Sequence, residues 1–319
     1  MNTVVEKLGL MGIIPVVVIE DETNAAPLAR ALADGGLSTM EITFRTEAAA
    51  GSMARIAKEL PEILLGAGTV LTVDQVKTAV KCGARYIVSP GLNRKVVEYC
   101  LAANIPVIPG IVSPTEIGDA LDAGVHAVKF FPAEASGGLE YLKAISAPFR
   151  NMKFVPTGGI DEDNLLSYLR LPQVLACGGS WMVKADLISG RRFDEIKRLT
   201  GQALGKMMGF QLSHVGMNNA DASEAGAGAT MLSRLLKLPV RENEGSVFVG
   251  KEFELLKRQY LGAHGHIAIG TNFLERAIAY FAGHGIKVKE ETRSRKDGRL
   301  ASVYLDLEIC GFAVHLLQL

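Results

Sequence analysis

The feature that most constrains the fold is an eightfold alternation of short apolar runs with amphipathic segments, which extends from residue 12 to residue 206. Short apolar runs of this length, bounded by turn residues, are typical of buried strands. Strands that alternate with helices pair in parallel through crossover connections. The eight runs are Ile13–Ile19, Thr39–Phe44, Leu64–Val70, Tyr86–Gly91, Pro106–Ile111, Ala127–Pro132, Lys153–Gly158 and Val174–Gly179.

Eight strand–helix units within these residues predict a closed α/β (β/α)8 (TIM) barrel. An open doubly wound sheet is the alternative, although such sheets rarely use eight units of such even length. The helices expected between the strands are Asn24–Ala33, Glu47–Glu59, Val73–Cys82, Arg94–Ala103, Pro114–Asp122, Leu139–Ala144, Glu162–Leu169 and Asp194–Lys206.

After residue 206 the pattern changes, and two modules of the order strand, helix and three strands follow each other. Such an internal repeat predicts a second, smaller α+β domain of two βαβββ modules. We therefore expect a barrel domain over residues 1–206 and a second domain over 207–319. The expected elements of the first module are His214–Met217, Ala222–Leu236, Val240–Glu242, Val247–Val249 and Phe253–Leu256. Those of the second are His266–Ile269, Leu274–His284, Lys287–Glu291, Ala301–Leu307 and Phe312–Leu317.

The charge balance narrows the range of partners. The chain carries 34 basic and 34 acidic residues, so no excess charge attracts nucleic acid or an acidic membrane surface. Residues 1–10 include Glu6 and Lys7 and lack the apolar core of a signal peptide. Apolar runs such as Ile13–Ile19 are too short to span a bilayer. These observations predict a soluble, cytoplasmic protein with a small-molecule substrate.

Lys129 is the first candidate for chemistry, because it lies within the sixth apolar run. A buried ammonium without a partner is costly, and its usual response is a lowered pKa. The neutral amine is the form that attacks a carbonyl carbon. The alternative is a lysine that points outward between the helices.

Glu41 lies in the second run, opposite the sixth strand of an eight-stranded barrel. Strand alternation places Glu41, Thr43 and Arg45 on one face, and the apolar residues between them on the other. We expect the polar face to point into the barrel, so that Glu41 serves as acid–base opposite Lys129. Arg45 is a candidate carboxylate clamp, with a surface ion pair as its alternative.

Two glycine pairs follow the last two strands. Gly158-Gly159 follows the seventh and Gly178-Gly179 the eighth, where barrels often bind phosphate. Tight turns would explain the glycines equally well. The first pair leads into acidic residues and the second into Ser180, so we place the phosphate mainly at Gly179 and Ser180. The only histidine of the barrel is His126, and we expect chemistry without a metal or cofactor there.

Together these stretches resemble the family of 2-keto-3-deoxy-6-phosphogluconate (KDPG) and 2-keto-4-hydroxyglutarate (KHG) aldolases over residues 1–206. The matching segments are residues 40–47, 66–70, 89–91, 109–111, 129–134, 156–160 and 178–181. Lys-Phe-Phe-Pro-Ala-Glu at 129–134 together with Pro-Thr-Gly-Gly-Ile at 156–160 is the most specific combination.

The resemblance implies a class I lyase of carbohydrate metabolism, in the Entner–Doudoroff pathway. Lys129 would form the Schiff base and Glu41 would shuttle protons. It also implies a homotrimer, and cleavage of KDPG to pyruvate and glyceraldehyde 3-phosphate. The implied substrate-binding residues are Arg45, Thr69, Pro90, Phe131, Thr157, Gly158, Gly159, Gly179 and Ser180.

The resemblance leaves the substrate open among KDPG, its galactonate epimer and KHG, which would yield pyruvate and glyoxylate. The Gly178–Ser180 segment favours a phosphorylated substrate. Other Schiff-base lyases and decarboxylases are alternatives. A non-catalytic sugar-acid sensor is another, although it would be expected to have lost Lys129 or Glu41.

Residues 207–319 resemble the glyoxalase, or vicinal oxygen chelate, superfamily at lower specificity, through residues 253–256, 265–269 and 311–316. The resemblance implies a divalent metal on four strand positions, which here hold His214, Glu254, His266 and His315. Such a set suits zinc, nickel, iron or manganese. His315 departs from the family, which usually has glutamate there. The alternative is an oligomerisation or regulatory module without metal.

Overall fold

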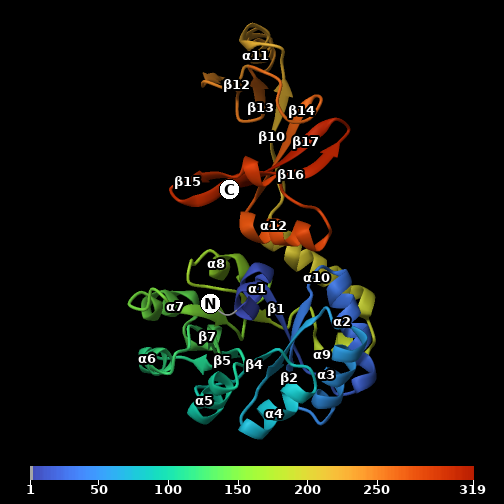
Figure 1. Ribbon diagram of the computed structural model, residues 1–319, viewed down its shortest axis with the longest axis vertical. Helices are drawn as coiled ribbons and strands as arrows, with labels where there is room; N and C mark the ends of the chain where they lie inside the picture. The colour runs from blue at the N-terminus through green and yellow to red at the C-terminus, as the bar shows by residue number, and fades with distance from the viewer. Residues whose placement is uncertain (1–2) are drawn as a thin grey trace. The chain divides into compact units, whose positions relative to one another are not determined.

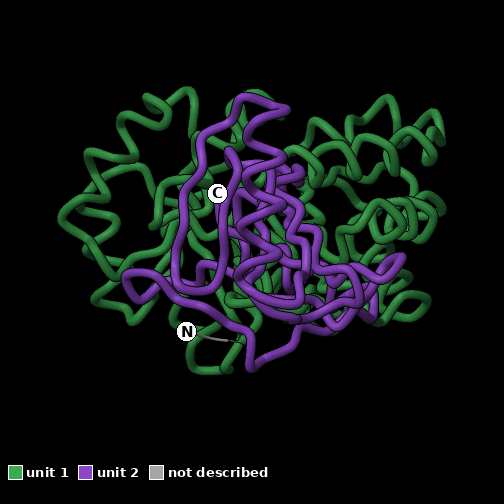
Figure 2. The backbone as a smooth tube through the Cα atoms, turned by 90° about the horizontal axis from the view of Figure 1, so that it is seen from above, with its two compact units in different colours: residues 1–206 green, residues 207–319 purple. Residues whose placement is uncertain are grey.

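The computed structural model describes residues 3–319, which form two compact units divided between Lys206 and Met207 (Figure 2). The first unit is built around short parallel strands, and the second around one larger mixed sheet (Figure 1).

The strands of the first unit close into a barrel. They run in parallel in the order β5-β4-β3-β2-β1-β9 and β6-β7-β8. Bridges from Thr157 to Gly178 and from Phe154 to Val174 join β8 to β9. β5 and β6 are two halves of the fifth run, separated at Pro109. The strands are β1 (Ile13–Val17), β2 (Thr39–Thr43), β3 (Leu64–Gly68), β4 (Tyr86–Val88), β5 (Val107–Ile108), β6 (Gly110–Ile111), β7 (Ala127–Phe130), β8 (Lys153–Pro156) and β9 (Cys177–Gly179).

The predicted helices form around this barrel (Figure 1). Two of them begin with capping boxes: Thr72 and Gln75 cap α4, and Ser113 and Glu116 cap α6. The helical elements are α1 (Thr3–Met11), η1 (Glu22–Asn24), α2 (Ala25–Asp34), α3 (Ala48–Glu59), α4 (Val73–Lys81), α5 (Arg94–Ala102), α6 (Pro114–Asp122), η2 (Glu134–Ser136), α7 (Gly138–Ser146), α8 (Leu165–Leu169), α9 (Ala185–Ser189) and α10 (Phe193–Met208).

Helix α1 precedes the first strand and was absent from the prediction. Its Val5 and Leu8 are buried, and they join a core cluster that includes Ile14 of β1, Tyr86 of β4 and Val155 of β8. Because one cluster gathers side chains from several strands, α1 packs against the apolar interior of the barrel. Its burial stabilises the barrel through the hydrophobic effect.

The second unit contains one eight-stranded sheet in the order β11-β12-β13-β10-β14-β17-β16-β15. β10 and β14 pair antiparallel at its centre, and each also pairs in parallel with the last strand of its own module, β13 or β17. Two similar halves therefore meet at the central pair. The elements are β10 (Gln211–Asn218), α11 (Ala222–Leu236), β11 (Val240–Glu242), β12 (Ser246–Val249), β13 (Phe253–Leu256), β14 (Gly265–Thr271), α12 (Leu274–Gly283), η3 (Glu290–Thr292), β15 (Ser294–Lys296), β16 (Arg299–Ile309) and β17 (Phe312–Gln318).

One predicted strand of the second module is wrong. Residues 287–291 make only a single bridge, from Val288 to Leu305, and the strand lies instead at Ser294–Lys296. The next two residues, Asp297 and Gly298, have φ of 51° and 75°. Asp-Gly with positive φ at both positions forms a tight hairpin turn, and this turn pairs the residues directly before it with β16.

Within the described residues, no helix is long and apolar enough to cross a membrane.

Candidate active site

Lys129 and Glu41 meet inside the barrel. Lys129 comes from β7 and Glu41 from β2, which lie opposite each other, and Lys129 Nζ donates a hydrogen bond of 3.1 Å to Glu41 Oε1. The side chains are only 7% and 3% exposed. A lysine and a carboxylate in direct contact, largely removed from water, can exchange a proton without a solvent intermediary. The sequence predicted both residues, and the structure brings them together.

Room for the Glu41 carboxylate depends on a neighbouring glycine. A Cβ placed on Gly68 of β3 would lie 2.1 Å from Glu41 Oε1. Any larger residue would therefore force the carboxylate away from Lys129. Two residues after Glu41, Thr43 Oγ1 donates to the Val17 carbonyl oxygen, which ties the buried end of β2 to β1.

Arg45 and Thr69 form a second pair beyond the ends of their strands. β2 ends at Thr43, so Arg45 lies outside the strand whose alternation was used to orient it. Arg45 is exposed, and its Nε donates to Thr69 Oγ1 at 3.4 Å. Thr69 has φ of 57°, which turns the chain directly after β3. Both side chains can therefore hydrogen-bond a molecule that enters above the lysine.

Phe131 and Pro90 also lie beyond strand ends. The Phe131 ring centroid is 5.3 Å from Lys129 Nζ, so the ring flanks the amine. Pro90 follows β4 by two residues. Parallel strands all end on the same side of a barrel, so these groups lie on the side where such barrels carry their active sites.

The two glycine turns are adjacent, because Thr157 bridges to Gly178. Gly158 and Gly159 have φ of 95° and 80°, a conformation that favours glycine. A Cβ on Gly178 would lie 2.4 Å from Thr157 Oγ1, so the missing side chain leaves room for that hydroxyl. Ser180, directly after β9, is exposed. Two main-chain turns next to a hydroxyl can bind an oxyanion.

Two residues of this region were missed by sequence reasoning. Tyr168 of α8 donates its hydroxyl to Glu134 Oε1, and the Glu134 backbone N–H donates to the Gly158 carbonyl at 3.0 Å. Glu134 ends the Lys-Phe-Phe-Pro-Ala-Glu motif, which was the one available signal. Tyr168 has no signal in the sequence, because its partner is 34 residues away in the chain.

A second polar cluster lies in the second unit, at residues predicted as metal ligands. His214 Nε2 and His266 Nε2 are 3.0 Å apart, and Glu254 Oε2 lies 3.1 Å from the first and 3.3 Å from the second. Metal bonds of about 2.1 Å place neighbouring ligand atoms about 3.0–3.4 Å apart. The three side chains are at most 16% exposed. This donor set therefore fits a transition-metal ion.

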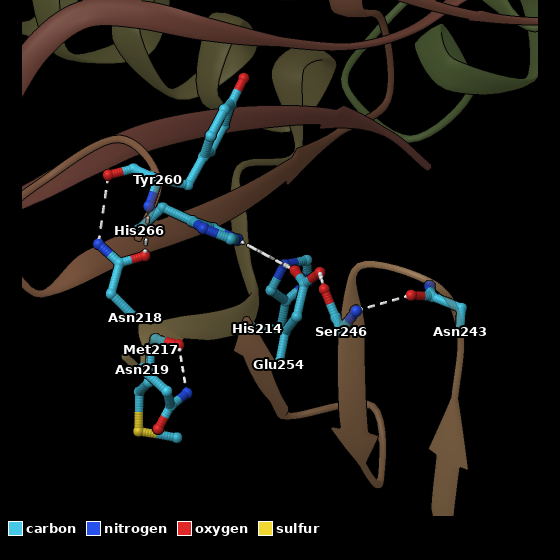
Figure 3. A network of polar contacts seen from close by, with 9 residues as sticks. All are labelled: His214, Met217, Asn218, Asn219, Asn243, Ser246, Glu254, Tyr260 and His266. Atoms are coloured by element: carbon cyan, nitrogen blue, oxygen red, sulfur yellow. Dashed lines mark hydrogen bonds and ion pairs between the residues drawn. The ribbon is translucent and has the colours of Figure 1, made fainter. Parts of the chain in front are cut away.

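The Glu254 carboxylate is fixed from its other side (Figure 3). Ser246 Oγ donates to Glu254 Oε1 at 2.6 Å, and the Ser246 N–H donates to Asn243 Oδ1 at 2.8 Å. Burial raises the pKa of Glu254, but hydrogen bonds from His214, His266 and Ser246 outweigh burial and hold it well below its usual range. The carboxylate is ionised, as a metal ligand must be.

His315 completes the cluster. One donor atom from each of His214, His266 and His315 lies within 4.8 Å of the others. The His315 ring stacks on Tyr304 with ring centroids 4.1 Å apart, and its buried Nδ1 has no hydrogen-bond partner. Burial, and then the two nearby histidines, lower the pKa of His315 to about 3. The ring is therefore neutral near pH 7 and able to bind a cation.

Strand register explains why these four residues converge. In each module the candidate on the last strand pairs with the residue two positions after the histidine of the first strand. The pairs are Glu254 with Gly216 in the first module, which carries His214, and His315 with Ala268 in the second, which carries His266. Glu254 and His315 are therefore equivalent positions of the internal repeat.

A β/α barrel that buries one lysine against a carboxylate has the arrangement of enzymes that form a Schiff base with a carbonyl substrate. Comparison with known families agrees. Residues 4–199 match the family model described as KDPG and KHG aldolase. The chain belongs to this family, and its first unit is an aldolase, a carbon–carbon lyase.

Individual relatives extend the comparison. The 2-dehydro-3-deoxy-phosphogluconate aldolase of Treponema pallidum is 50% identical over 204 residues, which is 64% of this chain and 97% of the relative. The KHG/KDPG aldolase of Escherichia coli K12 is 42% identical over 60% of this chain and 90% of its own length. The crystal structure of the Legionella pneumophila KDPG aldolase, with pyruvate captured as a covalent carbinolamine, superposes with a TM-score of 0.62. It is 39% identical and covers 63% of this chain and 98% of that one.

Proposed function

We propose that the barrel cleaves 2-keto-3-deoxy-6-phosphogluconate to pyruvate and glyceraldehyde 3-phosphate through a Schiff base on Lys129. The observation that carries the proposal is the buried contact of 3.1 Å between Lys129 Nζ and Glu41 Oε1. The names of the relatives from T. pallidum and L. pneumophila support the substrate.

The contact suggests how the reaction proceeds. Proton transfer to Glu41 leaves a neutral Lys129 amine, which adds to the C2 carbonyl carbon of the substrate. One proton then moves from the added nitrogen to the C2 oxygen to give the carbinolamine, and Glu41 donates its own proton to the same oxygen, which leaves as water and yields the iminium. As base, Glu41 removes the proton of the C4 hydroxyl, and the C3–C4 bond breaks with its electrons moving into the iminium. The enamine regains a proton at C3, and water releases pyruvate and restores the amine.

The surrounding residues suit the two ends of this substrate. We assign Arg45 and Thr69 to the carboxylate, because a guanidinium and a hydroxyl both donate to it. Pro90 and Phe131 would border the pyruvyl group. Thr157, Gly158, Gly159, Gly179 and Ser180 would bind the phosphate through backbone N–H groups and hydroxyls.

Borohydride trapping tests the mechanism. Incubation with pyruvate and sodium borohydride should add one reduced pyruvyl group, and peptide mass spectrometry should locate it on Lys129. The matched control is Lys95→Ala, which removes an exposed lysine of α5 and should label normally. Label on another lysine, or no label in the wild type, would contradict the proposed nucleophile.

The substrate range needs a separate assay. The name of the E. coli relative includes KHG, so we include KHG cleavage to pyruvate and glyoxylate as a second activity of the same site. Pyruvate release from KDPG, its galactonate epimer and KHG, measured side by side, ranks the three. The retained Lys129–Glu41 contact argues against a sensor without catalysis.

We further propose that the aldolase is cytoplasmic and acts as a homotrimer, as its family resemblance implies. Phosphorylated sugar acids are charged and retained inside cells. Light scattering coupled to size-exclusion chromatography of the full chain measures the mass of the assembly directly. The mass of a monomer or dimer would contradict the trimer.

For residues 207–319 we propose a glyoxalase-like domain that holds a divalent transition metal on His214, Glu254 and His266, with His315 as a fourth ligand. The interatomic distances of 3.0–3.3 Å carry this proposal. Such an ion would supply Lewis acidity at this cluster. Elemental analysis should find about one metal per chain by this donor count. Protein that carries and binds no metal would instead favour an oligomerisation or regulatory module.

A further inference from the structure

We propose that Glu134 and Tyr168 are positioning residues, which clamp the Gly158–Gly159 turn and thereby set the affinity of the barrel for the phosphate end of its substrate. This inference rests on the proposed function for the role of the turn. Neither residue needs to touch the reacting carbon atoms. Both act through the turn that they hold.

The first part of the clamp is main chain. The Ala133 N–H donates to the Thr157 carbonyl at 2.8 Å, and the Glu134 N–H donates to the Gly158 carbonyl at 3.0 Å. Residues 133–134 are therefore joined to the turn directly after β8. Because Lys129 lies only five residues before Glu134, the segment that carries the nucleophile also carries the clamp.

The second part is the stem of the Glu134 side chain. A Cβ on Gly159 would lie 2.6 Å from both Cβ and Cγ of Glu134. The bare Gly159 backbone therefore packs directly on this stem. At φ of 80° the glycine is also in a conformation that other residues adopt only with strain.

The third part is the carboxylate. Tyr168 is 1% exposed and donates its hydroxyl to Glu134 Oε1. A hydrogen bond to an ionised acceptor is about twice as strong as one between neutral groups. Burial, and then the hydrogen bond to Glu134, raise the pKa of Tyr168, so the phenol remains a donor. The buried Tyr168 thus fixes the carboxylate end of the Glu134 side chain.

Tyr168 is itself tied to the turn. It lies in α8, which begins six residues after Gly159. Asn164 Nδ2, directly before this helix, donates to the Gly159 carbonyl at 2.8 Å. The turn is therefore held from η2 on one side and from the start of α8 on the other. Release of the Glu134–Tyr168 contact therefore loosens the first side, which keeps its main-chain hydrogen bonds, while Asn164 still holds the second.

Kinetics of the full chain test the clamp. Tyr168→Phe removes only the donor, and we expect KM for KDPG to rise about five- to tenfold while kcat changes less than about twofold. Glu134→Ala should raise KM by the same factor. Glu134→Gln should raise KM less, because its amide oxygen still accepts the hydrogen bond. The double variant Glu134→Ala/Tyr168→Phe should raise KM no more than one single variant does. Borohydride trapping of pyruvate, which has no phosphate, should keep the wild-type rate.

Tyr99→Phe, on a partly buried position of α5, and Glu140→Gln, on an exposed position of α7, are matched controls, and both should behave as wild type. Hydrogen exchange of the turn amides should accelerate in the Tyr168 and Glu134 variants alone. A KM within about twofold of wild type, a trapping rate that falls in the same proportion, or unchanged exchange would each overturn the clamp. If the wild type does not cleave KDPG, the proposed function fails, and hydrogen exchange still decides whether the clamp exists.

Discussion

Glu41, buried in the barrel, and Glu254, partly buried in the second unit, are carboxylates held in different ways. Glu41 accepts a hydrogen bond from Lys129, across the barrel. Glu254 contacts His214, His266 and Ser246, which together hold its pKa well below the usual range. A carboxylate that pairs with one amine can return a proton to it, whereas a carboxylate fixed by three donors stays ionised. The first arrangement suits proton transfer and the second suits a metal ligand.

The largest predicted effect concerns the barrel pair. Lys129→Ala should lower the rate of pyruvate release from KDPG on the order of 10⁴-fold or more, because the reaction loses its covalent intermediate. A coupled lactate dehydrogenase assay measures this rate. Lys95→Ala should retain it, and chelator should leave the wild-type rate unchanged. Substantial activity in Lys129→Ala would show that Lys129 is not the nucleophile, and that its contact with Glu41 does not serve proton transfer.

The next effect isolates the proton carrier. Glu41→Gln preserves size but cannot exchange a proton, so kcat should fall about 10²- to 10³-fold. Lys129 should still trap pyruvate slowly under borohydride. An unchanged kcat would show that another group moves the protons and that Glu41 is only a partner of the lysine.

A third effect tests whether Glu254 and the histidines around it bind a metal. His266→Ala should abolish metal binding, and Ser246→Ala should weaken it about 10- to 100-fold, because Ser246 orients Glu254. Competition with a chelating dye measures both affinities. His284→Ala, on an exposed residue after α12, is the control and should bind as wild type. Equal affinity of all these proteins would indicate that the cluster is structural.

The smallest effect is on stability. The pKa of His315 is lowered from 6.5 to about 3 in the folded metal-free chain, so below pH 6.5 the unfolded state binds more protons. The stability of the second unit should therefore fall as the pH falls from 6.5 toward 3, by roughly 1–2 kcal/mol at pH 5. Urea unfolding at pH 7.5 and 5 measures it. His315→Gln should flatten this pH dependence, and a second unit equally stable at both pH values would contradict it.

Much of the barrel follows from local pattern. Apolar runs such as Leu64–Val70 contain the observed strands, because a strand buried on both faces needs apolar residues at successive positions. Helix α1 was missed because it precedes the first repeat and its role is to fill the barrel interior. The strand at Lys287–Glu291 was misplaced because the Asp297-Gly298 turn decides the pairing of its neighbours.

The candidate site residues likewise include some that the sequence reveals and some that only the structure reveals. An isolated lysine in an apolar strand, and a carboxylate that alternates with apolar residues, are visible in the sequence as Lys129 and Glu41. The contact of Glu134 with Tyr168 is not visible, because it joins two segments 34 residues apart in the chain and follows no helical or strand period. Ser246 and Glu254 lie diagonally across the paired strands β12 and β13, so their contact depends on the register of that pair.

The sequence by itself determined the order of the elements, the residues in each buried strand and the direction in which Glu41 points, because alternation along a strand is a local property. Only the tertiary structure decided that Glu41 lies 3.1 Å from Lys129, and that His214 lies 3.0 Å from His266. Those distances depend on how the barrel closes and on the register between β10 and β14. Barrel closure and strand register are set by packing among residues far apart in the chain.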